Sequence, residues 1–185
     1  MDNRSLDENK QTVEIIRYIR HEWLNQAQLL KSNLALGRLE DVDRLIDDMV
    51  MKARNEGRLT NLNAVKLAAF LLTYNSRSDS LRIDLDVTGP VHDLSHLDNW
   101  LVKVVSHVLE CYRKALSYDE EERVLVSIQT EPALAVEFDW QGQGVSIDTF
   151  SHLLDAAAKR EPLLLEGERV IRADEIWLTV PCKKE

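Results

Sequence analysis

The stretch Leu81-Arg-Ile-Asp-Leu-Asp-Val-Thr88 alternates between apolar and polar side chains. Successive side chains of a β-strand point to opposite faces, so this period of two predicts a strand with one face in solvent. Gly89-Pro90 follows directly and ends the predicted strand. The chain before this point has a different character, and the strand therefore marks where a helical part gives way to a mixed one.

The first 60 residues consist largely of helix-forming residues, contain no proline, and have glycine only at Gly37 and Gly57. We expect a helix over residues 6–36 that ends at Gly37, with Ser5 as its N-cap. A second helix is expected over residues 40–55, where apolar residues recur at helical spacing, and Gly57 ends it. Because the connection between the two helices is very short, they must run antiparallel.

This predicted helical hairpin, residues 1–60, has an apolar stripe that it cannot cover by itself. Its first helix has about 30 residues, which is longer than the helices of most globular proteins. We therefore expect two copies of the chain to pair through their hairpins as a four-helix bundle.

The rest of the chain, residues 61–185, mixes helical and strand patterns. Two of the predicted strands form a hairpin whose turn contains Glu131-Pro132. The mixture predicts an α+β fold in which helices and a sheet form a sandwich, with the domain boundary near residues 58–62. The expected helices cover residues 63–75, 94–116 and 148–159, and the expected strands cover residues 81–88, 123–130, 134–140 and 175–180.

Composition speaks against several classes of protein. The 185 residues carry 23 Lys and Arg against 32 Asp and Glu, a net charge of -9, so neither nucleic acid nor an anionic membrane is an expected partner. The longest apolar run, residues 67–72, is far too short to span a membrane. The polar N-terminus does not resemble a signal peptide. Cys111 and Cys182 lack metal-ligand spacing, which favours a cytoplasmic protein with reduced thiols.

His21 is placed unusually on the first predicted helix. At about 100° per residue, His21 lies about 170° from the centre of the apolar arc. Its nearest neighbours on that side are polar, and Val13 and Leu24 flank them more loosely, so a buried core histidine is disfavoured. On periodicity alone, a surface histidine without a role remains an open interpretation. The apolar arc consists of Ile15, Ile16, Ile19, Trp23, Ala27, Leu30 and Leu34.

The local sequence around His21 points to a function. Residues 19–29, Ile-Arg-His-Glu-Trp-Leu-Asn-Gln-Ala-Gln-Leu, resemble the phosphoacceptor box of two-component signalling proteins. The similarity is to the arginine-histidine-acid version, found in the sporulation initiation phosphotransferase family and in citrate-type sensor kinases. It continues through residues 29–36 and past residues 59–62, and it covers essentially the whole chain.

The resemblance implies that His21 accepts a phosphoryl group, and a neutral imidazole nitrogen is chemically competent to do so. It implies that Glu22 orients the imidazole or assists proton movement. The surrounding stripe would bind an acidic, phosphorylated partner, although each of its members also has a plain interpretation as a solvated helix residue. The implied partner-binding residues are Arg17, Arg20, Asn25 and Gln28.

The second half resembles the ATP-binding domain of histidine kinases in its order of elements, but its nucleotide-binding positions are altered. His107 and Cys111 stand where that family has two asparagines, and a thiol is a poor ligand for magnesium. Trp140 stands at the position of the adenine-reading aspartate, and Asp139 lies one residue early, so its side chain points to the other face of the strand. The resemblance therefore implies a degenerate domain with no bound nucleotide, cofactor or metal.

The expected protein is a cytoplasmic, homodimeric phosphotransferase of a phosphorelay. By the resemblance, His21 takes a phosphoryl group from the aspartyl phosphate of a single-domain response regulator. It then passes the group to the receiver domain of a second regulator, a sporulation transcription factor. Magnesium would sit in the receiver domain. Two alternatives remain open, an ATP-dependent sensor-type kinase or phosphatase core and a non-catalytic dimer that only docks a receiver.

Overall fold

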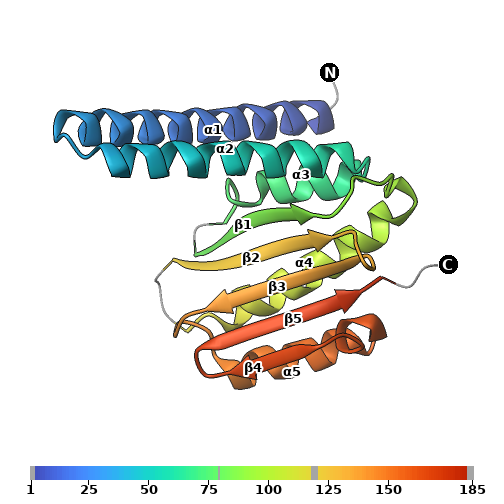
Figure 1. Ribbon diagram of the computed structural model, residues 1–185. Coiled ribbons are helices and arrows are strands. Elements are labelled where there is room, and N and C mark those ends of the chain that lie inside the picture. Colours follow the sequence, from blue (N-terminus) through green and yellow to red (C-terminus); the bar gives the residue numbers. More distant parts are fainter. Residues whose placement is uncertain (1–2, 79, 118–120, 183–185) are drawn as a thin grey trace. The chain divides into compact units, whose positions relative to one another are not determined.

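The computed structural model describes residues 3–78, 80–117 and 121–182. The chain divides into two compact units, Met1–Arg54 and Asn55–Glu185. The first unit is helical, and the second combines a β-sheet with helices (Figure 1). The predicted fold class, a helical hairpin followed by an α+β domain, is confirmed.

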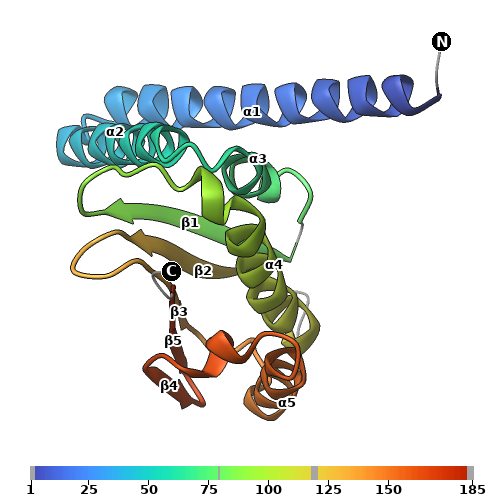
Figure 2. The same cartoon turned by 90° about the vertical axis from the view of Figure 1, so that its right-hand side faces the viewer.

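The first unit consists of two helices that run in opposite directions on either side of a short turn (Figure 1). Helix α1 covers Asn3–Ala35 and helix α2 covers Leu39–Asn61, of which the residues from Asn55 onward belong to the second unit. In Figure 2 the N-terminal part of α1 extends beyond α2. Gly37 lies in the turn with a φ of 68°, a conformation that favours glycine. The predicted N-cap at Ser5 is wrong, because α1 begins two residues before it.

Helix α2 also corrects the predicted end at Gly57, since it continues without a break to Asn61. A glycine inside a helix costs about 1 kcal/mol relative to alanine, which tertiary contacts readily outweigh. Residues on either side of Gly57 make such contacts. The Asn55 side chain donates a hydrogen bond of 2.9 Å to the Leu85 carbonyl oxygen, and Arg58 Nε donates one of 2.7 Å to that of Val87.

The sheet of the second unit has five strands in the order β1-β2-β3-β5-β4. Strands β1 and β2 are parallel, and the other neighbouring pairs are antiparallel. All four predicted strands are confirmed to within one residue at each end. Strand β4 was not predicted, because it is a four-residue edge strand. The strands are β1 (Leu81–Thr88), β2 (Glu122–Gln129), β3 (Ala135–Gln141), β4 (Arg169–Arg172) and β5 (Glu175–Pro181).

Helices cover one face of this sheet (Figures 1 and 2). The helix predicted from residue 94 begins at Asp98, preceded by a short 3-10 turn. Asp98 is buried, and its carboxylate accepts hydrogen bonds of 2.9 Å from the backbone N–H groups of Lys66 and Leu67, at the start of the preceding helix. The helices are α3 (Val65–Tyr74), α4 (Asp98–Ala115) and α5 (Ile147–Ala158), with the 3-10 segments η1 (Ser95–Leu97) and η2 (Pro162–Leu165).

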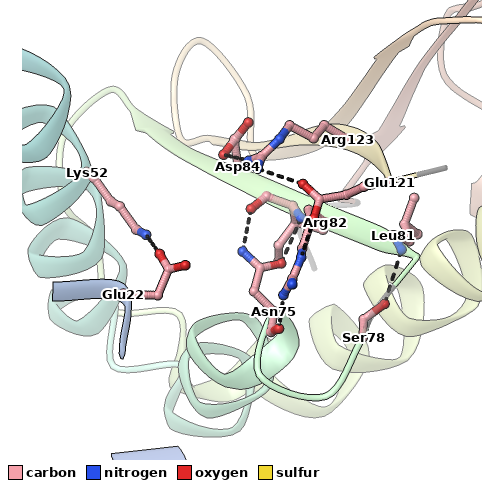
Figure 3. A network of polar contacts seen from close by, with 10 residues as sticks. Glu22, Lys52, Asn75, Ser78, Leu81, Arg82, Asp84, Glu121 and Arg123 are labelled. Atoms are coloured by element: carbon pink, nitrogen blue, oxygen red, sulfur yellow. Dashed lines mark hydrogen bonds and ion pairs between the residues drawn. The ribbon is translucent and has the colours of Figure 1, made fainter. Parts of the chain in front are cut away.

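Side chains close the outer edge of β1. The Asn75 amide donates a hydrogen bond of 2.8 Å to the Ile83 carbonyl oxygen and accepts one of 2.9 Å from the Ile83 N–H (Figure 3). Asn55 binds the same edge further along, at Leu85 and Val87. These contacts satisfy backbone groups that an edge strand otherwise offers to another chain.

No helix in the described part of the chain has both the length and the apolar character that crossing a membrane requires.

Candidate functional site

His21 lies in the middle of α1 and is exposed. Within the described residues, no hydrogen bond or ion pair engages its imidazole. The neighbours that the sequence singled out, Arg17, Arg20, Asn25 and Gln28, are exposed as well. The structure thus places all of these side chains on the solvated surface of one helix, with His21 among them. The imidazole is free to meet an incoming group.

The exposed residues around His21 lie on a different side of α1 from the residues that face α2. They also lie on a different side from a row of exposed apolar residues. Half-buried residues mark the side that packs against α2, and at about 100° per residue their centre lies about 120° from His21. Exposed apolar residues form a separate row, centred about 150° from His21 in the other direction. The half-buried row is Ile15, Tyr18, Glu22, Gln26, Leu30 and Asn33, and the exposed apolar row is Ile16, Ile19, Trp23, Ala27 and Leu34. Three further exposed apolar residues, Val13, Leu24 and Leu29, lie outside this row.

Glu22 belongs to the row that faces α2. Its carboxylate forms an ion pair of 3.5 Å with the Lys52 ammonium of α2 (Figure 3). In this conformation the Glu22 carboxylate is therefore directed toward α2. That Glu22 orients the imidazole of His21 stays a prediction. Lys52 was not singled out from the sequence. It lies 30 residues from Glu22, and only the register of the two helices brings the pair together.

The structure places Cys111, which the resemblance to histidine kinases aligns with a nucleotide-binding position, in the core of the second unit. Burial raises the pKa of its thiol to about 11, so the group is protonated at neutral pH. A protonated thiol is not a ligand for magnesium. His107, one turn earlier on α4, is half-buried, and its Nδ1 atom has no hydrogen-bond partner within the described residues.

Trp140 stands at the position that the resemblance to histidine kinases assigns to the adenine-reading aspartate. Its indole is fully buried, and the N–H donates a hydrogen bond of 2.8 Å to Glu122 Oε2. Gly142 and Gly144 lie against the same carboxylate, and a side chain at Gly144 would collide with it. The Gly-x-Gly turn thus packs on a carboxylate of its own chain. Asp139 lies on the opposite face of β3, as the one-residue displacement predicts.

Within the described part of the chain, no three His, Cys, Asp or Glu residues are grouped closely enough to hold a metal ion. His92 and His96, which are four residues apart in sequence, are both exposed near the start of α4. Of the acidic residues at positions 119–122, the first two lie outside the described residues. Glu121 pairs with Arg82 and Arg123, and Glu122 accepts a hydrogen bond from Trp140.

The structure defines a two-part architecture, in which a helical hairpin with an exposed histidine is followed by an α+β domain. Residues 1–62 match the SpoOB-type sensor-kinase alpha-helical domain. Residues 63–180 match the C-terminal domain of sporulation initiation phosphotransferase B. The chain therefore belongs to the sporulation initiation phosphotransferase B family.

A curated relative supports this assignment. Over 119 residues the chain is 33% identical to sporulation initiation phosphotransferase B of Bacillus subtilis (strain 168). The aligned part covers 64% of this chain and 62% of the relative, so it spans less than two thirds of that protein.

Proposed function

We propose that this protein is a cytoplasmic, homodimeric phosphotransferase of a phosphorelay, with His21 as the residue that carries the phosphoryl group. The donor is the aspartyl phosphate of a single-domain response regulator. The acceptor is the receiver aspartate of a second regulator, a transcription factor of sporulation. The observation that carries the proposal is the exposed His21 on the solvated stripe of α1, together with the match to a family named for phosphotransfer.

Phosphoryl transfer between aspartate and histidine requires little from this chain beyond the correct placement of the His21 imidazole. The lone pair of an imidazole nitrogen of His21 forms a bond to phosphorus while the bond between phosphorus and the carboxyl oxygen of the donor breaks, and the donor aspartate leaves as a carboxylate. The second transfer reverses these steps on another aspartate. Such transfer depends on in-line alignment and charge neutralisation. A rigid helix that presents the histidine outward meets the first need, and magnesium in the receiver meets the second.

The surface around His21 suits an acidic receiver pocket. Residues 1–60 carry 10 basic and 11 acidic side chains, whereas residues 61–185 carry 13 and 21. The hairpin is therefore nearly neutral, and Arg17 and Arg20 are exposed beside the histidine. A near-neutral surface with two guanidinium groups does not repel a receiver as the acidic second unit would. We propose that Asn25 and Gln28 complete this docking stripe.

Dimerisation through the hairpin explains the exposed apolar rows. On α1, the row that includes Ile19 and Trp23 lies about 90° from the side that packs on α2. Helix α2 has the same arrangement, with Leu39, Ile46 and Val50 exposed about 90° from the side that includes Val42. In a four-helix bundle each helix contacts two neighbours at about a right angle. A second copy of the chain would therefore cover both rows and leave two His21 residues outside.

We propose that the second unit binds no ATP. The buried, protonated Cys111 thiol cannot take the place of a magnesium-binding asparagine. The buried Trp140 indole and the Glu122 carboxylate occupy the turn where related kinases bind adenine. If the protein instead were a kinase core, labelled ATP would bind to it or label it in the absence of any receiver.

Transfer of labelled phosphate from a phosphorylated receiver domain tests the proposal. Wild-type protein should acquire an acid-labile label and pass it to a second receiver. The variant His21→Gln should lose both steps, whereas His152→Gln, which alters another exposed histidine, should retain them. Transfer by His21→Gln would overturn the proposal. Binding of the receiver without any transfer by the wild type would favour a non-catalytic docking dimer.

A further inference from the structure

The second face of the sheet is free of helices and has a distinctive set of side chains. The second unit places α4 and α5 on the other face, and no described element of this unit covers the second face (Figures 1 and 2). We call it the open face. Its side chains come from alternate strand positions, because inward-pointing residues such as Phe138 and Leu178 belong to the core. Its centre is formed by Leu125, Glu137, Asp139, Trp177 and Thr179.

Asp139 is the unusual member of this face. The register places it directly between Leu125 on β2 and Trp177 on β5, two apolar neighbours. Its Oδ1 atom is buried and has no hydrogen-bond partner within the described residues. A carboxylate oxygen removed from water without a partner is unfavourable. The neighbours on the sheet leave this cost uncompensated, so a cation supplied from outside would be stabilising.

The charges on the open face are not evenly matched. Its arginines are engaged at one end of the sheet, where Arg123 pairs with Asp84 at 3.4 Å and with Glu121 at 2.9 Å (Figure 3). Arg172 pairs with Glu175 at 3.6 Å. Three other carboxylates on this face form no ion pair with a lysine or arginine in the described part of the chain. They are those of Asp86, Glu137 and Asp139. The open face therefore has an acidic centre with an aromatic ring beside it.

The acidic centre has a spacing that an extended chain can match. Glu137 and Asp139 are two residues apart on β3, which places them about 7 Å apart on one face. An extended peptide repeats its side chains on one side at the same interval. Cationic side chains at alternate positions of such a peptide would meet both carboxylates. An arginine at Asp139 would also lie beside the Trp177 ring, where a guanidinium group is favoured.

We propose that the open face is a docking surface for an extended basic segment of a partner protein, with one cationic side chain on Asp139 between Leu125 and Trp177 and the next on Glu137. The excess of acidic over basic side chains in residues 61–185 would steer such a segment toward this unit. The surface is distinct from the His21 stripe, and its function does not depend on phosphotransfer. Its failure would leave the role of His21 untouched.

Two labelled peptides of equal composition test this proposal with the full-length protein. In one peptide three arginines alternate with three serines, and in the other the three arginines precede the three serines. Fluorescence anisotropy measures affinity at low ionic strength, and a change in tryptophan fluorescence that the variant Trp177→Phe abolishes reports on contact with Trp177. We expect the alternating peptide to bind more tightly and to change the tryptophan signal. Equal affinity for the two peptides would show attraction by net charge alone and would overturn the proposal.

Matched variants locate the binding. Asp139→Asn should weaken binding of the alternating peptide about tenfold, the effect expected from losing one close charge pair. Asp155→Asn removes the same charge from an exposed position on α5 and should leave the affinity unchanged. Glu137→Gln provides an independent second variant if Asp139→Asn does not fold, as judged by circular dichroism. Equal loss of affinity in the α5 variant, or none in either open-face variant, would contradict the proposal.

Discussion

The two units of this protein bury their side chains very differently. In the described part of the first unit, Met1–Arg54, Val42 is the only apolar residue that is buried, and Trp23 remains 62% exposed. In the second unit, Tyr112, Phe138 and Trp140 are fully buried within one continuous core. A long helix with so little burial gains little from packing, and propensity alone seldom stabilises it. This difference supports the proposal that a second copy of the chain completes the hairpin, whereas the second unit has a core of its own.

The largest expected effect tests this difference at the exposed apolar row. The double variant Ile19→Glu, Trp23→Glu places two carboxylates where we propose that the two copies meet. Burying unpaired charges costs several kcal/mol, so the dissociation constant of the dimer should rise about a thousandfold or more. Sedimentation equilibrium over a range of concentrations measures this change.

The control for this variant keeps the charge and moves it to the docking stripe. Asn25→Glu, Gln28→Glu alters two exposed positions on the other side of the same helix and should leave association unchanged. A wild-type protein that sediments as a monomer at all concentrations would refute the four-helix bundle. So would a double variant at Ile19 and Trp23 that still forms dimers.

A smaller effect tests whether the second unit balances its own buried charges. Glu161 is buried, and its carboxylate accepts a hydrogen bond of 2.8 Å from the Lys103 ammonium and one of 3.3 Å from the Trp100 indole. The Lys103 hydrogen bond is the main cause that lowers the pKa of Glu161 below its ordinary value. Lys103→Met should reduce the free energy of unfolding by about 1–2 kcal/mol at pH 7, since the ammonium is itself half-exposed.

The pH dependence of this effect has a definite sign. Because the folded-state pKa of Glu161 is lowered, its contribution to stability is complete above the unfolded pKa and is lost as the pH falls through the folded one. Urea unfolding should therefore show that wild type and Lys103→Met become more similar in stability below about pH 4. Lys114→Met removes an exposed pair with Glu110 on the same helix and should cost less. A pH-independent difference at Lys103 would contradict the explanation.

The smallest expected effect compares two glycines of the second unit. Gly57 lies inside α2, and no described atom beyond its own stretch of helix lies within 4 Å of the point that a methyl group would occupy. Gly57→Ala should therefore stabilise the protein by about 0.5–1 kcal/mol. Gly144 lies against the Glu122 carboxylate, so Gly144→Ala should be destabilising. Thermal unfolding of the two variants measures whether each substitution raises or lowers the stability. A destabilised Gly57→Ala would mean that α2 does not continue through this residue.

Most of the fold could be predicted, because local periodicity marks each long element. The alternation over residues 81–88 predicts β1 with its bounds, and the helical spacing around Leu101 and Val105 predicts α4. The failures occur where local signals are weak or are outweighed. Strand β4 has only four residues. Helix α2 continues through Gly57 because the side chains of Asn55 and Arg58 form hydrogen bonds to the backbone of β1.

The candidate site was predicted in part, for a related reason. The position of His21 opposite the apolar arc depends only on helical phase, and the structure places it exposed. The ion pair of Glu22 with Lys52 could not be predicted, because it depends on how two helices align across a turn. The role of His21 stays a prediction until transfer is measured.

The sequence by itself determined the helical hairpin, four of the five strands, the exposed histidine and the difference in charge between the two halves. These follow from spacing along one element and from composition, which need no knowledge of distant contacts. Only the tertiary structure decided where the Glu22 carboxylate points, how Glu122 packs on Trp140 and Gly144, and why Asp139 lies between Leu125 and Trp177. Each of these joins residues from different elements, and their meeting is set by packing and strand register, which a local pattern does not encode.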